Sequence, residues 1–182
     1  MACDLTRGRK EPCKDVVGGL KNIYFTHFGD YGTVTQTDDE ITDMSGTFTA
    51  FKYELKGNSS FEQAITSSRE NGTTFFEQTL NLTLKKLSKE DNKELKLLAF
   101  GRPHVAVEDY NGNVFVMGLE HGAEITGGSI STGAAMGDLS GYTLTLAASE
   151  LKPANFVSAP TAANPYDGMT SATVTITEGT NS

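Results

Sequence analysis

Residues 46–86 read GTFTAFKYELKGNSSFEQAITSSRENGTTFFEQTLNLTLKK, and this stretch decides the fold. Apolar and polar side chains alternate with a period of two around Tyr53 and again from Leu80 to Leu84. That period is typical of β-strands that bury one face. We therefore predict two long strands joined at Asn71-Gly72, because Asn-Gly suits both central positions of a type I′ hairpin turn.

A single helix is predicted directly after this hairpin, at residues 88–100. Ser88 is a suitable N-cap residue, and Asp91 three positions later completes a pattern that resembles a capping box. Gly101 and then Pro103 mark the end of the helix. The apolar face is expected to consist of Leu87, Leu95, Leu98 and Ala99.

Shorter strands are predicted on both sides of this region. One covers residues 19–27, a second hairpin spans 104–118 with its turn at Asn111-Gly112, and alternation returns over 139–148. Val174 and Ile176 indicate a last edge strand. The predicted fold class is mainly β, a β-sandwich or barrel with one flanking α-helix and a long β-hairpin.

The chain divides into three parts by composition. Residues 1–18 form a charged N-terminal arm, and 19–157 form the β-sandwich domain with its long hairpin (46–86) and helix (88–100). Residues 158–182 are a C-terminal extension, predicted to begin as a loop because Pro160 and Pro165 lie in it.

The two cysteines, Cys3 and Cys13, both lie in the arm, so a disulfide framework for the fold is excluded. The N-terminus lacks the apolar segment of a secretory signal, and no stretch approaches the ~20 apolar residues of a membrane-spanning helix. We expect a soluble protein made in a cytoplasm with reduced thiols, although a local clip between the two cysteines stays open.

The formal net charge of −8 is unevenly distributed. The arm is basic, whereas from Pro103 onward Lys152 is the single base among eight acidic residues. An acidic body argues against holding nucleic acid, because phosphate contacts need Lys and Arg. The basic arm either pairs with the acidic part of a neighbouring copy or is a solvated segment.

No catalytic, cofactor-binding or metal-ligating residue is assigned. His27 and His104 have no ligand partner at a useful spacing, and zinc at Cys3, Cys13 and His27 would need unusual spacing. Glu120-His121 lies near Glu124, but neighbouring residues of a strand point to opposite faces. We therefore expect His121 to be a hydrogen-bonded or exposed histidine.

Motifs that would indicate an enzyme are absent. The sequence contains neither a GxxxxGK[ST] loop nor a GxGxxG fingerprint, and Gly127-Gly128-Ser129 lacks the pattern of a nucleophile elbow. The carboxylate pairs Asp38-Asp39 and Glu108-Asp109 are interpreted as solvated turn residues. An enzyme is therefore the least favoured class.

The glycine-rich segment Gly122–Gly137 allows two interpretations. Small residues let another backbone approach closely, as at a subunit interface. A flexible surface loop is the other interpretation. The interface is favoured because Ile125, Ile130 and Met136 would be awkward in a fully exposed loop.

The order of these parts resembles the tail-tube fold of tailed bacteriophages. The resemblance covers roughly Asp15–Val157, from the strand pair at 46–86 to the closing stretch GAEITGGSISTGAAMGDLSGYTLTLAASE. The segment KLLAFGRPHVAVEDYNGNVFVMG (residues 96–118) is similar in sequence to structural proteins from phages and prophages of Bacteroidetes-type hosts. The extension after Ser158 and the interruption at Gly57-Asn58-Ser59-Ser60 depart from the pattern, and the resemblance carries no catalytic residue.

What the resemblance implies is a virion structural protein. It would assemble in the host cytoplasm into a homo-oligomeric ring, a hexamer or a ring of higher order, and become part of the virion tail. The ring would contact neighbouring tail or connector proteins, let DNA pass through its lumen without specific binding, and need no membrane or cofactor. The alternatives are a capsid-decoration or head-completion protein, and a β-sandwich module that binds carbohydrate or a cell-surface partner.

Overall fold

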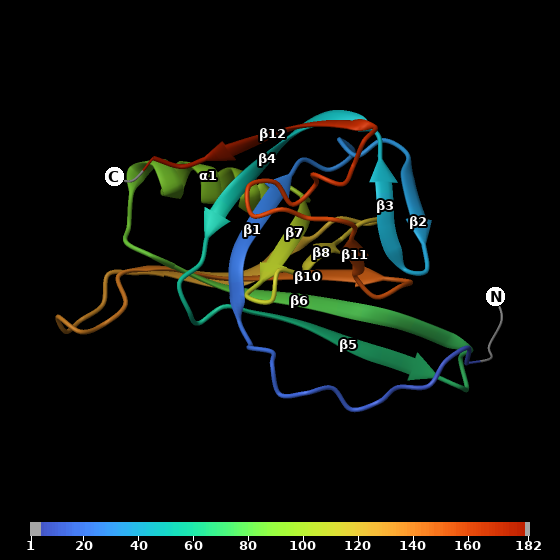
Figure 1. Ribbon diagram of the computed structural model, residues 1–182. Coiled ribbons are helices and arrows are strands. Elements are labelled where there is room, and N and C mark those ends of the chain that lie inside the picture. The colour runs from blue at the N-terminus through green and yellow to red at the C-terminus, as the bar shows by residue number, and fades with distance from the viewer. Residues whose placement is uncertain (1–4, 181–182) are drawn as a thin grey trace.

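The computed structural model describes residues 5–180, which fold into twelve strands in two sheets and one helix (Figure 1). The prediction of a mainly β protein with a single helix is confirmed for these residues. In chain order the elements are β1 (Leu20–Thr26), β2 (Val34–Thr37), β3 (Glu40–Met44), β4 (Gly46–Glu54), β5 (Ser60–Ser68), β6 (Thr73–Lys85), α1 (Lys89–Phe100), β7 (His104–Asp109), β8 (Val114–Met117), β9 (Glu124–Ser131), β10 (Gly141–Glu150), β11 (Asn155–Val157) and β12 (Ala172–Glu178).

The larger sheet has eight strands in the order β12-β4-β1-β7-β8-β11-β3-β2. Most neighbours are antiparallel, but β11 pairs with β3 and β12 pairs with β4 in parallel. β3 passes into β4 through Ser45, although the two strands lie near opposite ends of the order. This sheet therefore curls, and Figure 1 shows it wrapping around the loop before β12.

The smaller sheet has the order β5-β6-β10-β9 and is antiparallel throughout. Its inner face packs against the larger sheet and α1, because alternate residues of β6 and β10 point inward. Together they build the first core cluster, whose most buried members include Ile23, Val105, Val107, Leu80, Leu82 and Leu146.

A second core cluster lies inside the curl of the larger sheet. It contains Tyr24, Ile41 and Val116 from the strands, together with Tyr166 and Met169 from the loop that precedes β12. Tyr166 is 1% exposed. Residues 158–169 form the predicted loop; its second half fills the curl with Pro165, Tyr166 and Met169, whereas residues 161–163 are exposed.

The predicted span of the long hairpin is wrong. The hairpin consists of β5 and β6 alone, while β4 belongs to the other sheet, between β12 and β1. The reason lies in the intervening turn, where Gly57 and Asn58 both have positive φ values of 81° and 54°. The left-handed backbone there redirects the chain from one sheet to the other.

Both Asn-Gly turns occur where they were predicted, but neither is type I′. Gly72 and Gly112 have positive φ, whereas Asn71 and Asn111 do not. The first turn has four residues between the paired Ser68 and Thr73. In the second, the Gly112 amide donates to the Asp109 carbonyl, as expected for a type I turn followed by a glycine bulge.

The helix begins as predicted, since the Ser88 hydroxyl accepts a hydrogen bond from the Asp91 amide at 3.0 Å. Leu95 is buried and Leu98 packs against the first cluster, but Ala99 is exposed, which corrects its place on the apolar face. Gly101 ends the helix with φ −92°, so the left-handed stop expected of a glycine there is not used.

Replacing Ala159 by glycine should stabilise the protein. Ala159 has φ +46°, a conformation that costs an L-residue about 1 kcal/mol and costs glycine little. Because glycine also makes the unfolded chain more flexible, we expect a net gain of roughly 0.5 kcal/mol. Urea unfolding should show a higher midpoint for Ala159→Gly. The exposed Ala162, which lacks a positive φ, provides the control, and Ala162→Gly should not gain stability.

Candidate functional site

The outer face of the smaller sheet consists mostly of exposed or half-buried residues. Strand register places its side chains, because residues opposite one another across a ladder share a face. Thr145 on β10, for example, donates to Asn81 on β6 at 3.0 Å. The surface is dominated by threonine, serine and small residues, and its charged members are Glu62, Glu77, Glu124 and Lys85.

Two strand edges border this face, one at β5 and one at β9. Each strand pairs on one side only, β5 with β6 and β9 with β10. Their lengths are nearly equal, at nine and eight residues. The β9–β10 ladder has a register shift between Thr145 and Leu146. The rest of each edge is exposed and able to pair with another strand, which monomeric proteins normally prevent.

The glycine-rich segment 122–137 is a strand in its first half, which the sequence did not indicate. β9 covers residues 124–131, and the loop 132–140 then projects beyond the sheet (Figure 1). Asp138 holds this loop, because its carboxylate accepts from the amides of Ala134 and Ala135 at 2.9 and 2.8 Å and these bonds lower the pKa of Asp138. Met136 is fully exposed, so the favoured interface interpretation stays a prediction.

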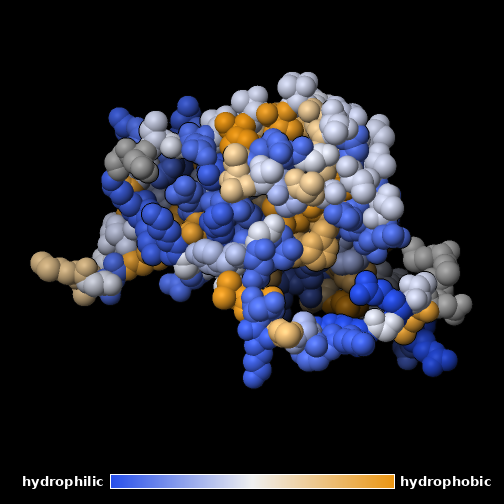
Figure 2. Space-filling model, in the orientation of Figure 1, coloured by the Kyte–Doolittle hydropathy of each residue, from blue (hydrophilic) through white to orange (hydrophobic). Residues whose placement is uncertain are grey.

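A groove of about 370 Å³ opens between β5 and the larger sheet, beside the end of the arm. Figure 2 shows a hollow between the upper part of the molecule and the lower layer. Phe61 and Phe115 line the groove, and their ring centroids are 6.3 Å apart. The ring centroid of Phe156 is 4.6 Å from that of Phe115. This row of three aromatic rings could not be predicted from the sequence, because its members come from three strands that are distant in the chain.

The arm runs along the lower side of the molecule in Figure 1 and is exposed throughout its described residues, 5–18. Its junction with the body is held by Asn111, whose side-chain amide bonds both the amide and the carbonyl of Val17, at 3.0 and 2.8 Å. The arm is therefore attached at one end and free to contact another molecule along its length.

His104 is buried, in contrast to the other two histidines. Its ring stacks on Tyr31, with centroids 4.4 Å apart, and on Phe28 at 5.0 Å. The Gly29 amide donates to Nε2 at 3.2 Å, so Nδ1 carries the proton and donates to the Gly118 carbonyl at 2.7 Å. Burial lowers the pKa of His104, and the ring is a structural element between two loops.

Stability should therefore depend on pH through His104. The unfolded chain takes up a proton near the ordinary pKa of 6.5, while the folded protein resists it, so stability is full above 6.5 and falls as the pH drops below that value. The slope from one proton is at most about 1.4 kcal/mol per pH unit. Urea unfolding between pH 7.5 and 5 measures it. His104→Gln should be less stable at pH 7.5 and lose this component, whereas the exposed His27→Gln should retain it.

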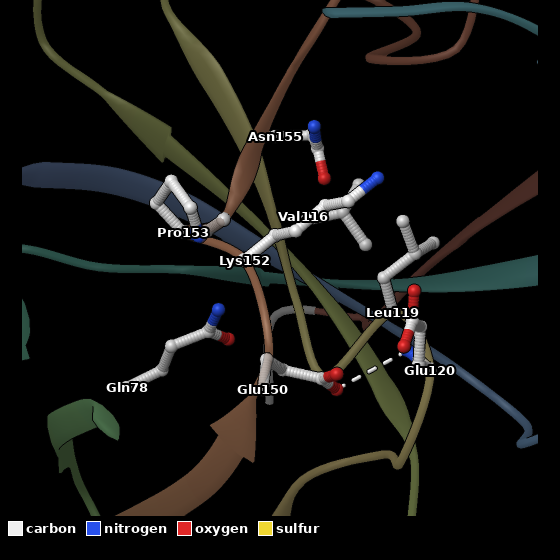
Figure 3. Close-up of a pocket in the computed structure, with 9 residues that line it drawn as sticks. Gln78, Val116, Leu119, Glu120, Glu150, Lys152, Pro153 and Asn155 are labelled. Atoms are coloured by element: carbon white, nitrogen blue, oxygen red, sulfur yellow. Dashed lines mark hydrogen bonds between the residues drawn. The ribbon is translucent and has the colours of Figure 1, made fainter. Parts of the chain in front are cut away.

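His121 meets Glu150, a partner that the sequence did not suggest. His121 lies in a turn, not in a strand, and its Nδ1 is 2.9 Å from Glu150 Oε2. Glu150 Oε1 accepts from the amides of Glu120 and His121 at 3.1 and 2.9 Å. Figure 3 shows Glu150 reaching toward Glu120 from the end of β10. The expected neighbour Glu124 is on the outer face of β9 and takes no part.

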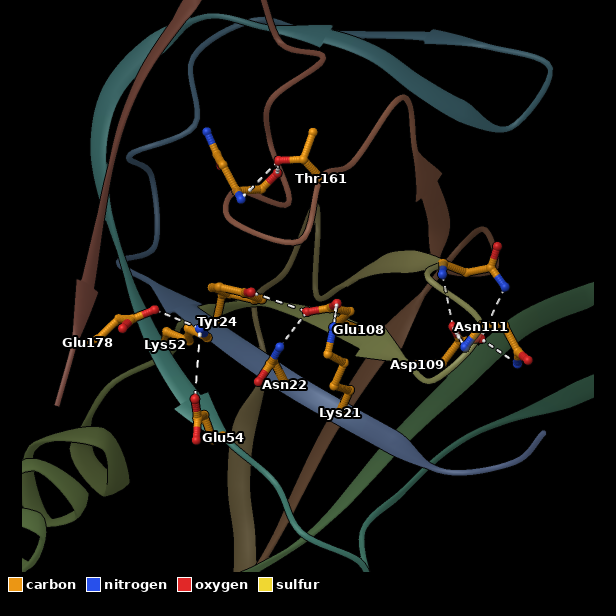
Figure 4. Close-up of polar contacts among 12 residues, drawn as sticks. Lys21, Asn22, Tyr24, Lys52, Glu54, Glu108, Asp109, Asn111, Thr161 and Glu178 are labelled. Carbon is orange, nitrogen blue, oxygen red and sulfur yellow. Dashed lines mark hydrogen bonds and ion pairs between the residues drawn. The ribbon is translucent and has the colours of Figure 1, made fainter. Parts of the chain in front are cut away.

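A second buried carboxylate, Glu108, lies within the larger sheet (Figure 4). It accepts from Asn22 at 2.7 Å, from Tyr24 at 3.2 Å and from the Lys21 amine at 3.2 Å. Burial and the adjacent negative charge raise the pKa of Tyr24 well above its ordinary value, so its hydroxyl stays a donor. The prediction that Glu108 is a solvated turn residue is therefore wrong.

The other candidate carboxylate, cysteine and serine residues lie apart from one another in the fold. Asp38 and Asp39 form the β2–β3 turn with φ of 51° and 63°, which is the type I′ conformation expected at the Asn-Gly turns. Asp109 binds the amides of its own turn, at Asn111 and Asn113. Cys13 is exposed, and Cys3 lies outside the described residues. Ser129 is on β9, without a histidine partner in the described chain.

Comparison with protein-family models, curated proteins and solved structures finds no match to this chain. No helix within residues 5–180 is long and apolar enough to cross a membrane. What the molecule does has to be inferred from its surfaces.

Proposed function

We propose that this chain is a virion structural protein that self-assembles into rings, forming a tail tube or a tail or connector channel through which DNA passes. One observation carries the proposal. The smaller sheet has two free edges of nearly equal length and a regular polar face that nothing in the described chain covers. In a monomer such edges promote unwanted pairing with other chains, whereas a ring uses them to join its subunits.

Strand direction supports closure. An antiparallel sheet with an even number of strands has its first and last strands running in opposite directions, as β5 and β9 do. Copies related by rotation about one axis therefore bring β9 of one copy beside β5 of the next in antiparallel orientation. The contact repeats around the axis until the ring closes, and closure leaves the smaller sheets without a free edge.

The uncovered face would then line the channel. Apart from Phe75, the side chains of this face are polar or small, and its three glutamates outnumber its single lysine. Threonine and serine make weak contacts with phosphate, and the glutamates repel it. DNA would slide along such a wall without being held, in contrast to a nucleic-acid-binding surface, which needs a basic face.

The loop 132–140 supports a role in joining rings. Register places Lys85 and Gly141 at one end of the sheet and the 69–72 turn at the other. In a closed ring these ends face opposite openings, since the strands run between them. Met136 at the loop tip would contact the next ring, and methionine adapts well to an irregular apolar surface.

The test is the assembly state of the purified chain. Gel filtration with light scattering should give a hexamer or larger ring, and electron microscopy should show rings or stacked tubes. A monomer that persists at high protein concentration would contradict the proposal. A ring structure whose lumen is lined mainly by Lys and Arg would contradict the channel assignment while leaving self-assembly intact.

The groove with Phe61 and Phe115 favours a second candidate function, a module that binds carbohydrate or a cell-surface partner. Aromatic rings in an open groove suit a flat ligand face. A stable monomer that binds a glycan array, and loses binding in Phe115→Ala, would support it. A chain that associates only with preformed capsids would indicate a decoration or head-completion protein.

A further inference from the structure

Glu120, His121 and Glu150 offer one ligand atom each, and these atoms all lie within 4.8 Å of one another. We propose that they form a binding site for a divalent transition metal such as Zn²⁺. The inference does not rest on the proposed assembly, because all three residues belong to one chain and lie on the 118–122 turn and at the end of β10.

The geometry already resembles that of a coordination sphere. Zinc binds imidazole nitrogen and carboxylate oxygen at about 2.0–2.2 Å, so in tetrahedral geometry two ligands of one ion are roughly 3.3–3.6 Å apart, a little more than a hydrogen bond. His121 Nδ1 and Glu150 Oε2 are 2.9 Å apart. The ion would replace the proton between them, with His121 carrying its proton on the exposed Nε2. The exposed Glu120 side chain needs only a rotation to become the third ligand.

Glu150 is fixed in place before any ion binds. Its side chain is 5% exposed, and the amides of Glu120 and His121 hold Oε1, which leaves Oε2 directed at the site. Hydrogen bonds to a ligating carboxylate are the usual support of a metal site. The Glu150 carboxylate therefore loses little conformational entropy when the ion binds.

A small pocket beside the cluster has room for a water ligand of the ion. A pocket of about 10 Å³, large enough for one water molecule, adjoins Glu120 and Glu150 and is lined by the buried Asn155. Asn155 donates from Nδ2 to Asp39, while its Oδ1 has no hydrogen-bond donor among the described residues and points toward the pocket in Figure 3. A water ligand in the pocket could donate to that oxygen.

The imidazole of His121 is the one ionic partner of the Glu120 and Glu150 carboxylates among the described residues. Among the ion pairs of residues 5–180, none joins Glu120 or Glu150 to a lysine or arginine. Lys152 lines the pocket, but its amine points away from the Glu150 carboxylate in Figure 3 and donates to Gln36 at 3.4 Å. One imidazole and two carboxylates suit zinc, manganese or iron better than magnesium.

Calorimetric titration with ZnCl₂ tests the proposal, on full-length chain without an affinity tag and with Cys3→Ser and Cys13→Ser to remove the arm thiols. We expect one zinc per chain, a higher unfolding temperature than in EDTA, and no response to Mg²⁺ at the same concentration. His121→Gln should abolish binding and Glu120→Gln should weaken it about tenfold or more. The controls His27→Gln and Glu124→Gln should bind like the parent.

Absence of zinc binding at millimolar metal would overturn the proposal. So would binding that His121→Gln retains, or binding that Glu124→Gln loses equally. Unfolding in EDTA shows whether each variant is folded, and Glu150 keeps both backbone bonds in His121→Gln. Ring assembly is measured on the same samples, so a failure of the metal site and a failure of self-assembly are read separately.

Discussion

Proline at one of two neighbouring positions on β9 should abolish ring assembly while leaving the subunit folded. Ser129 and Ile130 are consecutive residues in the regular part of β9, opposite Thr143 and Tyr142. Along a strand, successive amides point to opposite sides, so one of these two donates toward β10 and the other toward the open edge. Proline removes the amide at its own position and adds a bulky ring.

The outward-facing position is the informative one. Proline there leaves the β9–β10 ladder intact. It also leaves a carbonyl on β5 of the next subunit without its hydrogen-bond donor, which costs about 1–3 kcal/mol at each subunit contact. That corresponds to roughly 5- to 150-fold weaker association at each contact, and a closed ring suffers the loss at every one. Light scattering should show monomer or short open oligomers, with an unfolding midpoint close to that of the parent.

The same two positions provide the controls. Ser129→Ala and Ile130→Ala retain both amides and should form rings. The proline that faces β10 should lower stability as well, because it removes a ladder bond within the subunit. If both proline variants are folded and form rings like the parent, β9 is not the assembly edge.

Replacing Glu108 by alanine should destabilise the subunit more than any other single change considered. Asn22 is 5% exposed and Tyr24 is fully buried, and both donate to Glu108. Without the carboxylate these donors have no acceptor, at about 1–3 kcal/mol each, and a cavity remains. We expect a total loss of roughly 3–5 kcal/mol, a large fraction of the stability of a typical domain.

Urea unfolding at pH 7 measures this loss. Glu62→Ala is the matched control, since Glu62 is exposed on β5 and its removal should change stability by no more than about 0.5 kcal/mol. Glu108→Gln retains one acceptor oxygen and should fall between the two. Equal midpoints for Glu108→Ala and Glu62→Ala would show that the buried network contributes little.

The candidate site was only partly predictable. The sequence predicted β architecture and suggested an interface in the segment around β9, but it did not indicate which strands would be edges. A strand lies at an edge when no second strand pairs with it, and the local sequence of a strand does not show whether this is so. Glu124 is only three positions from His121 in the sequence, but the partner of His121 is Glu150, which is 29 residues away.

Residues close in sequence determined much of this protein by themselves. The alternation at Leu80–Leu84 marked β6, and the Ser88 cap marked the start of α1, because both signals depend on contacts within a few residues. Tertiary structure alone decided that β4 joins the larger sheet, that β12 pairs with β4 in parallel, and that β5 and β9 each keep one unpaired edge. Pairing between distant strands depends on how the whole hydrophobic surface is buried, and a period of two is the same for a central strand and an edge.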